Sequence, residues 1–596
     1  MAVDQALATP IARHIWATRY RAGEASVTAT WRRVAHALAA VEPADRDAWE
    51  GRFVDILQDF QFLPGGRIQA GAGIAREVTL FNCFVMGEIE DSIPGIFRAL
   101  QEGAVTMQRG GGVGYDFSTL RPHGARARAA GTIASGPVSF MDVWEAMCET
   151  IQSTGARRGA MMATLRCDHP DILSFIDAKR TAGRLTHFNL SVQVTDAFMQ
   201  AVAQDAAWAL VFPQARLDGD GETLLRDWPG ETGEVPCRVL RRLPARELWE
   251  RLLRAAYDSA EPGVLFIDRI NRQNNLSYCE RITATNPCGE VPLPSYGACD
   301  LGAINLTRLI RDPFTPRARL DGERLTEIAA TAVRFLDNVI DASPFPLPQQ
   351  QETVHQARRI GLGITGLADA LIMLGLHYGD AASLAFASET MRAICHAAYR
   401  QSTAIAEEKG CFPAFRREPY LEAPFIKSLP EDIRAAIARH GMRNSHLLAV
   451  APTGTISLLA GNVSSGIEPL FAPDQQRAVT AANGERQQFA LTDYAVDLWR
   501  RQNDRPDGVP PATLTATELP IEAHLAMQAA LQAFVDNSIS KTINVPASTG
   551  FADFAHVYTL AYERGLKGCT TFRPNPAMSG VVTAADPPTS RCDDCQ

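Results

Sequence analysis

One stretch, from Thr283 to Leu306, limits the local fold more than any other part of the chain. It reads TATNPCGEVPLPSYGACDLGAINL and places Cys288 between an amide, Asn286, and a carboxylate, Glu290. Its prolines and glycines exclude a regular helix, because proline lacks a main-chain N–H and glycine is conformationally costly to order. The stretch is therefore predicted to be a stiff loop that holds these three side chains in a fixed relation, with Cys299 eleven residues after Cys288.

The composition is that of an ordinary globular protein. The chain has 596 residues, of which 46% are hydrophobic and 21% charged, so it can bury a large core as several domains or as one large α/β barrel with additions. Its formal net charge of -9 argues against a surface that coats nucleic acid, which needs a basic excess. Small phosphorylated ligands remain open, because local backbone amides bind them.

The N-terminus and the cysteines indicate the compartment. Asp4, Arg13 and His14 interrupt any apolar segment long enough for a signal peptide, and no run of roughly eighteen apolar residues predicts a membrane span. The twelve cysteines are scattered rather than spaced as a secreted disulfide framework. We expect a cytoplasmic protein in which a reactive thiol pair would be functional.

Helical and strand patterns precede the loop. Ile11–Tyr20 and Ser26–Val41 have apolar residues at helical spacing, which predicts a helical region over residues 1–75. The apolar run Val78–Val85 predicts a buried strand that contains Cys83. A cysteine in a core strand is most often inert packing, so the pattern alone gives Cys83 no role.

Later segments are also assigned a coarse structure. Asn189–Val192 predicts another short strand. The polar, turn-rich segment from Asp205 to Val235 is interpreted as a surface excursion. Leu325–Ile340 and Gln349–Arg359 predict amphipathic helices.

Two glycine-containing turns are candidate ligand sites. The run QRGGGVGYDF, from Gln108 to Phe117, would let a ligand approach the backbone, or would simply form a tight turn. The apolar run Leu447–Val450 predicts a strand, and the PTGTIS turn after it could cradle an anion with N–H groups and hydroxyls. The candidate residues are Gly111 and Gly112 in the first turn and Thr453, Gly454, Thr455, Ile456 and Ser457 in the second.

Two further patterns are interpreted as structural. Gly361–Gly366 fits the dinucleotide fingerprint, but the segment before it is helical rather than a strand, so no nicotinamide site is expected. Asp168–Asp171 reads DHPD, yet Pro170 and the helical run behind it indicate a helix start with acids near its N-terminus. No metal site is predicted.

The end of the chain, residues 576–596, has the composition of a flexible linker. It closes with Cys592 and Cys595 in a CxxC pattern. Such a pair could be half of a zinc site, but zinc takes four ligands and no second pair is near in sequence. We interpret it as a redox dithiol on a mobile arm.

Taken together, these strings resemble the ribonucleotide reductases. The stretch Thr283–Leu306 is close to the finger-loop signature of that family, and with NSISKTINVP and GLKGCTTFR the resemblance covers roughly residues 15–575. It implies an α/β fold, a ten-stranded barrel of two five-stranded parallel halves over residues 76–575, with the finger loop through its centre. It also implies reduction of ribonucleotides to 2′-deoxyribonucleotides.

The resemblance assigns catalytic roles to five side chains. Cys288 becomes a thiyl radical that takes the 3′-hydrogen of the ribose. Glu290 accepts the 3′-hydroxyl proton, and Asn286 orients the sugar by hydrogen bonds. Cys83 and Cys299 protonate the departing water and end as a disulfide.

Ligand-binding and redox residues follow from the same resemblance. The two glycine-containing turns and the finger loop contact the substrate, and two other segments fall where the family senses effectors. The implied substrate-binding residues are Asn82, Gly111, Gly112, Pro287, Gly289, Thr453, Gly454, Thr455, Ile456 and Ser457, and the implied effector-binding residues are Arg121, Arg157 and Arg158. Cys592 and Cys595 would reduce the active-site disulfide by thiol exchange.

Three radical sources distinguish the branches of this family. The oxygen-dependent branch relays the radical from a second subunit through a tyrosine pair, whereas the corresponding segment here has Thr570, Thr571 and Phe572. The glycyl-radical branch lacks the loop glutamate, which is present here as Glu290. The adenosylcobalamin-dependent branch is therefore implied, and cobalamin is expected to bind with its own base attached because no DxHxxG-type histidine is evident.

The same resemblance predicts the partners. They are a ribonucleoside diphosphate, deoxynucleoside triphosphate effectors, a thioredoxin-type reductant and a second copy of the chain in a homodimer. No counterpart of the family's separate ATP-binding module is evident, so overall control by ATP and dATP is not expected.

Two alternative functions stay open. The first is the large subunit of an oxygen-dependent two-subunit reductase, which the missing tyrosine pair disfavours. The second is a non-catalytic nucleotide- or zinc-binding barrel, which would be expected to have lost at least one of the five catalytic residues.

Overall fold

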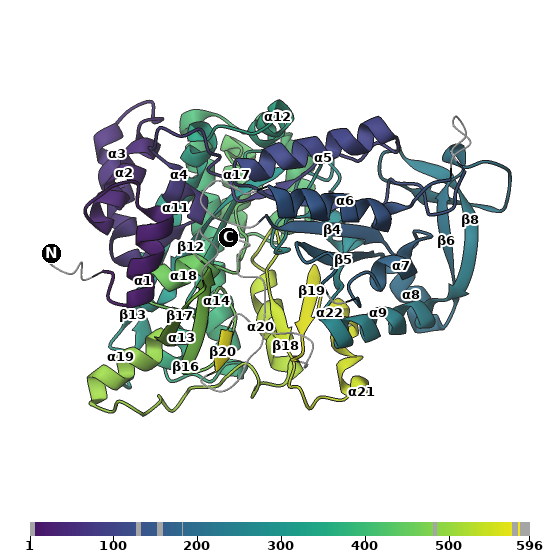
Figure 1. Ribbon diagram of the computed structural model, residues 1–596. Helices are drawn as coiled ribbons and strands as arrows, with labels where there is room; N and C mark the ends of the chain where they lie inside the picture. Colours follow the sequence, from purple (N-terminus) through teal and green to yellow (C-terminus); the bar gives the residue numbers. More distant parts are fainter. Residues whose placement is uncertain are drawn as a thin grey trace.

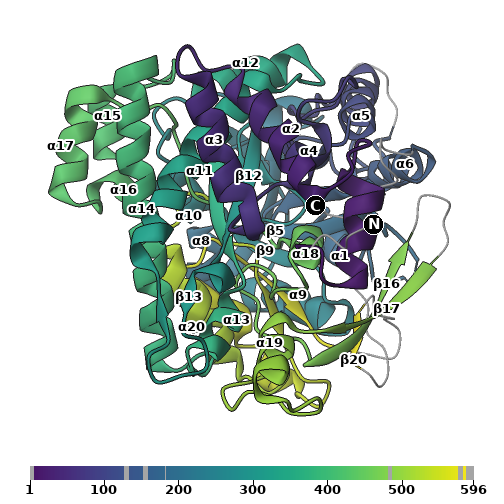
Figure 2. The same cartoon turned by 90° about the vertical axis from the view of Figure 1, so that its left-hand side faces the viewer.

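The computed structural model describes residues 6–126, 133–151, 159–181, 183–480, 486–574 and 582–584. It has a mixed α/β fold built around one ten-stranded sheet, in which most neighbouring strands are parallel. Helices cover this sheet in both views (Figures 1 and 2).

The region before the large sheet is mainly helical, as predicted, and lies at one end of the molecule (purple in Figure 1). Its helices begin at residues suited to capping: the Thr9 hydroxyl accepts from the N–H of Ala12, and the Ser26 hydroxyl accepts from that of Ala29. The elements are α1 (Pro10–Ile15), the π-helical turn η1 (Trp16–Tyr20), α2 (Val27–Ala39), α3 (Arg46–Leu57), η2 (Gln58–Phe60), β1 (Phe62–Pro64) and α4 (Gly66–Gly71). Strand β1 pairs with the large sheet, so this region is attached to it by main-chain hydrogen bonds.

Five parallel strands form the first half of the large sheet. In sheet order they are β2 (Cys83–Val85), β3 (Gly112–Asp116), β4 (Met161–Arg166), β5 (Phe188–Val194) and β9 (Gly263–Phe266). The connecting helices are α5 (Ile93–Gln108), α6 (Pro137–Thr150), α7 (Ile172–Ile176), α8 (Asp196–Gln204) and α9 (Ala245–Ser259). In Figure 1, α5 and α6 lie on one side of β4 and β5, and α8 and α9 lie on the other. Strand β5 confirms the short strand predicted at Asn189–Val192.

The second half is attached to the first by antiparallel pairs. Strand β12 (Ala298–Asn305) pairs antiparallel with β2 and parallel with β15 (Ile360–Thr365), while β19 (Gly568–Phe572) pairs antiparallel with β9 and parallel with β18 (Thr542–Asn544). Between them, Leu448 bridges Leu362 and Val450 bridges Ile539, both parallel. The strand predicted at Leu447–Val450 is therefore present only as isolated bridges.

Thirteen further α-helices follow β9 within the described residues. Two of them, α11 and α12, confirm the amphipathic helices predicted at Leu325–Ile340 and Gln349–Arg359. Those in the first part of this region are α10 (Ile267–Arg272), α11 (Gly322–Ala342), α12 (Pro348–Ala357), α13 (Leu367–Met373), α14 (Ala381–Lys409), α15 (Arg417–Glu422) and α16 (Pro424–Lys427). The rest are α17 (Glu431–His440), α18 (Gly454–Leu459), α19 (Tyr494–Asn503), α20 (Ile521–Gln532), α21 (Phe551–Phe554) and α22 (Val557–Glu563). None of the helices in the described ranges combines the length and the apolarity that a membrane crossing would require.

The strand predicted at Val78–Val85 is shorter than expected. Only Cys83–Val85 is a strand, because side-chain hydroxyls bind the N–H groups before it. Ser343 Oγ accepts from the N–H of Leu80, and Thr79 Oγ1 accepts from the N–H of Phe81. These bonds replace the ladder bonds that a longer strand would make.

The segment Asp205–Val235, predicted to be a polar surface excursion, contains strands that the sequence interpretation did not anticipate. Strands β6 (Ala207–Pro213), β7 (Thr223–Asp227) and β8 (Glu234–Pro244) form a separate antiparallel sheet in the order β6–β8–β7 (Figure 1, right). It has its own small core, which includes Phe212 and Trp228. The polar and turn-forming residues that suggested a loop lie mainly in the connections on either side of β7, residues 218–222 and 228–233, while exposed and less exposed positions alternate along β7 itself.

A third sheet joins two distant parts of the chain. Strands β16 (Asp474–Thr480) and β17 (Arg486–Thr492) form a hairpin, and β20 (Val582–Ala584) pairs antiparallel with β16 (Figure 2). The ring centroids of His14 in α1 and Phe489 in β17 are 5.1 Å apart, which packs the hairpin against the N-terminal helix. The remaining short elements are β10 (Ala284–Thr285), β11 (Pro292–Leu293), β13 (Ile310–Arg311), β14 (Arg319–Leu320), η3 (Gln214–Arg216) and η4 (Leu306–Leu309).

Candidate active site

The cysteine-containing stretch folds into a short β-hairpin rather than a helix. Strands β10 and β11 pair antiparallel, with Ala284 opposite Leu293. At the tip, the N–H of Gly289 donates to the carbonyl oxygen of Asn286 at 3.1 Å, which closes a turn with Pro287 and Cys288 at its centre. Proline second and glycine fourth are the residues that such turns favour, so the local sequence explains the tip.

The hairpin tip meets strand β2 at Cys83. The Asn286 Nδ2 group donates to the Cys83 sulfur at 3.1 Å, and this sulfur lies 3.8 Å from Glu290 Oε1. Asn286 also fixes the tip itself, because its Oδ1 accepts from the N–H of Val291 at 3.0 Å. Residues more than two hundred positions apart are thereby brought into one cluster.

The second redox-candidate cysteine lies directly beside the first. Cys299 in β12 is the register partner of Cys83 in β2, and both are buried free thiols. Cys288, in contrast, is partly exposed at the hairpin tip. The three thiols therefore divide into a buried pair and one accessible member.

Burial determines the protonation of this cluster. It raises the pKa of the Glu290 carboxyl to about 7, and hydrogen bonds from Asn286 and Cys83 offset only part of that effect. Burial raises the pKa of the Cys83 thiol well above its usual range, with the nearby Glu290 charge adding to it. Burial also raises the pKa of Cys299. The two buried cysteines therefore keep their protons at neutral pH and can give them up only in a coupled reaction.

Two side chains of β5 contact the hairpin and were not predicted as site residues. Asn189 Nδ2 donates to the carbonyl oxygen of Pro287, and Gln193 Nε2 donates to that of Thr283, each at 2.7 Å. The signal available in the sequence was the alternation in FNLSVQV, since strands buried on both faces usually read as continuous apolar runs.

Comparisons with known proteins identify the family of this chain. Residues 81–572 match the family model described as ribonucleotide reductase, barrel domain, and residues 6–77 match that described as ribonucleotide reductase, all-alpha domain. The chain belongs to the ribonucleotide reductase family. The resemblance found in the sequence is thereby confirmed.

Named relatives of this reductase show the extent of the similarity. The chain is 38% identical over 571 residues to the vitamin B12-dependent ribonucleoside-diphosphate reductase of Mycobacterium tuberculosis, an alignment that covers 93% of this chain and 76% of the relative. It is 35% identical over 559 residues to the protein of the same name from Thermoplasma acidophilum, covering 91% and 67%. A ribonucleoside-diphosphate reductase subunit alpha from Chlamydia pneumoniae is 27% identical over 480 residues, covering 74% and 45%.

The PTGTIS turn of the reductase opens a short helix, α18, as its sequence suggested. Thr453 has a positive φ of 55°, and its hydroxyl accepts from the N–H of Gly466 at 2.9 Å and lies 2.9 Å from Thr365 Oγ1. Ser457 Oγ donates to the carbonyl oxygen of Gly454. Thr455 and Ile456, the remaining members of the predicted set, are buried in the first turn. These hydroxyls therefore hold the turn together, which leaves its main-chain amides as the groups that could face an anion.

The glycine loop of the reductase lies beside the hairpin. A Cβ atom at Gly112 would come within 3.2 Å of the Pro287 ring, and one at Gly111 within 2.6 Å of the Phe84 ring. The carbonyl oxygen of Asn82 accepts from the N–H of Gly112 at 2.8 Å. Close packing thus explains why both positions are glycine, and it places Asn82 and Gly112 next to the finger loop.

The predicted effector and redox residues are placed only in part. Arg121 binds Asp91 through its side chain, with Nε donating to Oδ2 at 2.7 Å, and its own N–H donates to Oδ1 at 3.2 Å. Arg157, Arg158, Cys592 and Cys595 lie outside the described residues.

The segments Gly361–Gly366 and Asp168–Asp171, which were interpreted as structural from their sequence, make contacts within the fold. Gly361–Thr365 lies inside strand β15, preceded by helix α12, so it is not a strand-to-helix phosphate loop. In the DHPD segment, Arg166 donates to Asp168 at 2.8 Å and the His169 ring lies 3.0 Å from the Leu120 carbonyl oxygen. Over the described part of the chain, no group of three or more His, Cys, Asp or Glu side chains is arranged to hold a metal ion.

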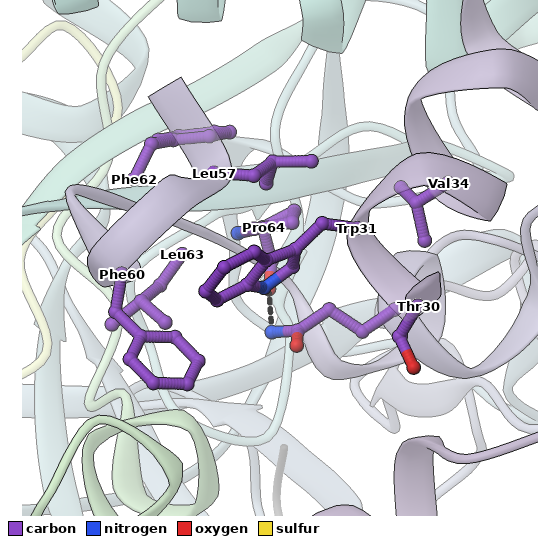
Figure 3. Close-up of a pocket in the computed structure, with 9 residues that line it drawn as sticks. Thr30, Trp31, Val34, Leu57, Phe60, Phe62, Leu63 and Pro64 are labelled. Atoms are coloured by element: carbon purple, nitrogen blue, oxygen red, sulfur yellow. Dashed lines mark hydrogen bonds between the residues drawn. The ribbon is translucent and has the colours of Figure 1, made fainter. Parts of the chain in front are cut away.

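A cavity lies in the N-terminal region, and none of the five proposed catalytic residues lines it. Trp31 packs edge-on against Phe60, with 5.2 Å between ring centroids, and Gln69 Nε2 donates to the carbonyl oxygen of Pro64 at 2.8 Å (Figure 3). The other lining residues are Thr30, Val34, Leu57, Phe62 and Leu63. None of the predicted substrate-binding residues lines this cavity.

Proposed function

We propose that this protein reduces ribonucleoside diphosphates to 2′-deoxyribonucleoside diphosphates in an adenosylcobalamin-dependent reaction. The observation that carries the proposal is the cluster at the hairpin tip, where Asn286 and Glu290 meet Cys83 and where Cys299 is the register partner of Cys83. The names of the relatives from Mycobacterium tuberculosis and Thermoplasma acidophilum support both the diphosphate substrate and the cofactor.

Each residue of the cluster has chemistry suited to one part of this reaction. Cys288, as a thiyl radical, takes the 3′-hydrogen of the ribose. Glu290 accepts the 3′-hydroxyl proton, and its Oε2 atom is buried without a hydrogen-bond partner within the described structure, so it is available to a ligand. With a pKa of about 7, the carboxyl is a base that operates near neutral pH.

The buried thiol pair supplies the reducing equivalents. The ribose loses its 2′-hydroxyl group as water, and Cys83 and Cys299 together give up two electrons and two protons. The two sulfurs then form one disulfide bond, which balances the reaction. Cys592 and Cys595 would reduce this bond by thiol exchange and would themselves be reduced by a thioredoxin-type protein.

The environment of Cys288 fits adenosylcobalamin. Cys288 is the partly exposed thiol of the cluster, and a Cβ atom at Gly289 would meet no atom within 4 Å, so there is space beside the thiol. When bound, the cofactor supplies the organic radical that oxidises a thiol. Cys288 is the residue of this chain that would face it.

A closed barrel around the hairpin is part of the proposal. Main-chain bonds lead from β15 to the segment 447–450, where the N–H of Leu362 donates to the Leu447 carbonyl oxygen at 2.8 Å. They continue to residues 537–544, where the N–H of Val450 donates to the Ser538 carbonyl oxygen at 3.2 Å. With β18 paired to β19, this path supports a ring of ten strands over residues 76–575 that would shield a thiyl radical from water.

Expected interactions with substrate, effectors and a second subunit complete the proposal. The turn at Thr453–Ser457 would bind the substrate diphosphate through main-chain amides, together with Asn82 and Gly112 beside the finger loop. Arg121, Arg157 and Arg158 would sense deoxynucleoside triphosphate effectors. The active form would be a homodimer in which residues 1–75 form a helical region and residues 576–596 a redox tail.

An assay of the purified chain alone tests the proposal. CDP or ADP is incubated anaerobically with dithiothreitol, with and without adenosylcobalamin. We expect deoxynucleotide only when the cofactor is present. Activity that required an added iron- or manganese-containing subunit would instead support the two-subunit alternative.

A further inference from the structure

Strand β5 has an unusual pattern for its position in the sheet. It is flanked by β4 and β9, and the alternate residues Phe188, Leu190, Val192 and Val194 belong to the main hydrophobic core. The residues between them, Asn189, Ser191 and Gln193, are polar although Ser191 and Gln193 are buried. Since side chains alternate along a strand, these three share the opposite face. A buried polar face must find hydrogen-bond partners.

Two of the three, Asn189 and Gln193, find such partners in main-chain carbonyl groups of the catalytic hairpin. Asn189 binds the carbonyl oxygen of Pro287, and Gln193 binds that of Thr283. Asn189 and Gln193 are four residues apart on β5. Their acceptors, Pro287 and Thr283, are also four residues apart, but their order along the chain is reversed, so the hairpin segment runs antiparallel to β5. The hairpin stem therefore lies along the polar face of β5, attached at both ends.

A third contact lies between these two points. A Cβ atom at Gly114 would come within 1.9 Å of the Thr285 carbonyl oxygen, so any larger residue there would displace the hairpin. Thr283, Thr285 and Pro287 alternate along the extended chain, and their carbonyl oxygens all contact the β3–β5 side of the sheet. The hairpin is thus attached to the sheet by one edge of its first strand.

The bond from Asn189 has a direct consequence for Cys288. The carbonyl group of Pro287 and the N–H group of Cys288 belong to one planar peptide unit, which also includes the Cα atom of Cys288. A donor that fixes the carbonyl oxygen therefore fixes the orientation of this plane. The sulfur of Cys288 is then free to move only by rotation about its own φ and side-chain torsions.

We infer that Asn189 is a positioning residue for Cys288: it orients the peptide plane on which the radical-carrying thiol is mounted, while Gln193 attaches the base of the same hairpin to β5. The inference rests on the proposed role of Cys288. It concerns a residue that does not itself react. Its effect should therefore be on the rate of the chemical step rather than on substrate binding or folding.

The test compares Asn189→Ala with Ser191→Ala, a matched control on the same face of β5. Three quantities are measured: kcat and KM with CDP, the thermal unfolding midpoint, and the rate of alkylation of Cys288 by iodoacetamide in the cofactor-free protein. The exposed thiols Cys279 and Cys411 provide internal references for the alkylation. Asn189→Asp, which keeps the size but removes the donor, is a second variant.

For Asn189→Ala we expect kcat to fall on the order of 10- to 100-fold with KM within about twofold, because small displacements of a reacting group have effects of this size. Cys288 should be alkylated several times faster, while Cys279 and Cys411 react as in the wild type. Asn189→Asp should show the same changes. Ser191→Ala should leave all of these quantities close to the wild-type values.

Two results would overturn the inference. One is an Asn189→Ala variant whose kcat and Cys288 alkylation both stay within about twofold of the wild type. The other is a parallel loss of kcat, KM and unfolding midpoint in both Asn189→Ala and Ser191→Ala, which indicates a general effect on folding. If the wild type reduces no ribonucleotide, the proposed function fails, but the alkylation rates still decide whether Asn189 orients Cys288.

Discussion

Cys83 and Cys299 are register partners in the antiparallel pair of β2 and β12. Residues directly opposite each other in such a pair have Cα atoms about 4.5 to 5.5 Å apart. A disulfide needs a Cα separation of roughly 4.4 to 6.8 Å. The two strands therefore need not separate or slide for the two buried thiols to be joined, and oxidation of this pair is compatible with the folded sheet.

The first prediction concerns this pair. In protein that carries Cys592→Ala and Cys595→Ala and has been reduced beforehand, one turnover without added reductant should leave Cys83 and Cys299 joined, detectable by mass spectrometry as a cross-linked peptide pair. Cys299→Ser should bind substrate but fail to complete reduction. Cys395→Ser, a change at a buried cysteine in α14, serves as the control and should remain active. Wild-type turnover by Cys299→Ser would contradict the proposed role of the pair.

The second prediction concerns the accessible thiol. Cys288→Ser should abolish turnover, because a serine hydroxyl is a far poorer hydrogen-atom carrier than a thiol. Nucleotide binding, measured by calorimetry, should be retained since the hairpin itself is held by main-chain and Asn286 contacts. The exposed Cys279 offers a matched control, and Cys279→Ser should turn over normally. Residual turnover by Cys288→Ser above the level without enzyme would remove Cys288 from its assigned role.

The third prediction is a pH dependence. Glu290 acts as a base only when ionised, and burial raises its pKa to about 7. In single-turnover experiments with pre-reduced protein, kcat/KM should therefore fall as the pH drops below about 7 and level off above it. Glu290→Gln should lose about two to four orders of magnitude in rate, together with this acidic limb. An unchanged pH profile in Glu290→Gln would show that another group titrates.

The fourth prediction concerns stability at the same residue. The pKa of Glu290 is about 7 in the folded protein against a reference of 4.5, so between these values the folded state binds more protons than the unfolded state. Ionisation of Glu290 thus lowers the free energy of unfolding as the pH rises through this range, by roughly 3 kcal/mol in total. Glu290→Gln removes this cost.

Urea denaturation of the wild type and Glu290→Gln at pH 5 and pH 8 measures this effect. The variant should gain stability relative to the wild type between pH 5 and pH 8. An equal difference between the two proteins at both pH values would mean that Glu290 does not titrate in this range.

Much of the local geometry of the candidate active site was predictable because its signals are local. Prolines and glycines around Cys288 determine a turn whatever surrounds it, and the residues at the tip follow from their sequence neighbours. The pairing of Cys83 with Cys299 is different, since strand register depends on contacts between segments far apart in sequence. The sequence could suggest it only through the resemblance to the family.

The errors in the fold have a similar origin. The run Val78–Val85 is apolar enough for a strand, but Ser343, distant in sequence, binds its main chain and shortens it. The segment Asp205–Val235 contains strands whose polar residues face solvent on a small separate sheet, a composition that also suits a loop. The contact of Asn189 with the finger loop was missed because a short polar residue in a strand indicates a partner without showing which one.

The fifth prediction concerns the terminal dithiol. A variant carrying Cys592→Ala and Cys595→Ala should form about one product per pre-reduced active site and then stop when thioredoxin is the reductant. Dithiothreitol, being small, should restore turnover at least in part by reaching the buried Cys83–Cys299 bond. Sustained turnover with thioredoxin would show that the tail is not the shuttle.

If Cys592 and Cys595 form the proposed shuttle, the pairing of β20 with β16 would limit how far they can reach. Cys592 is the twentieth residue after Phe572, the last residue of β19. An extended chain of that length can reach about 66 to 72 Å from Phe572. While Ala584 remains opposite Gln475, Cys592 is only eight positions beyond the paired strand, and an extended chain of that length would reach about 26 to 29 Å. A shorter tether concentrates the thiols near their anchor. A target farther from Ala584 than this reach would be accessible to the dithiol only if the three residues of β20 separated from β16.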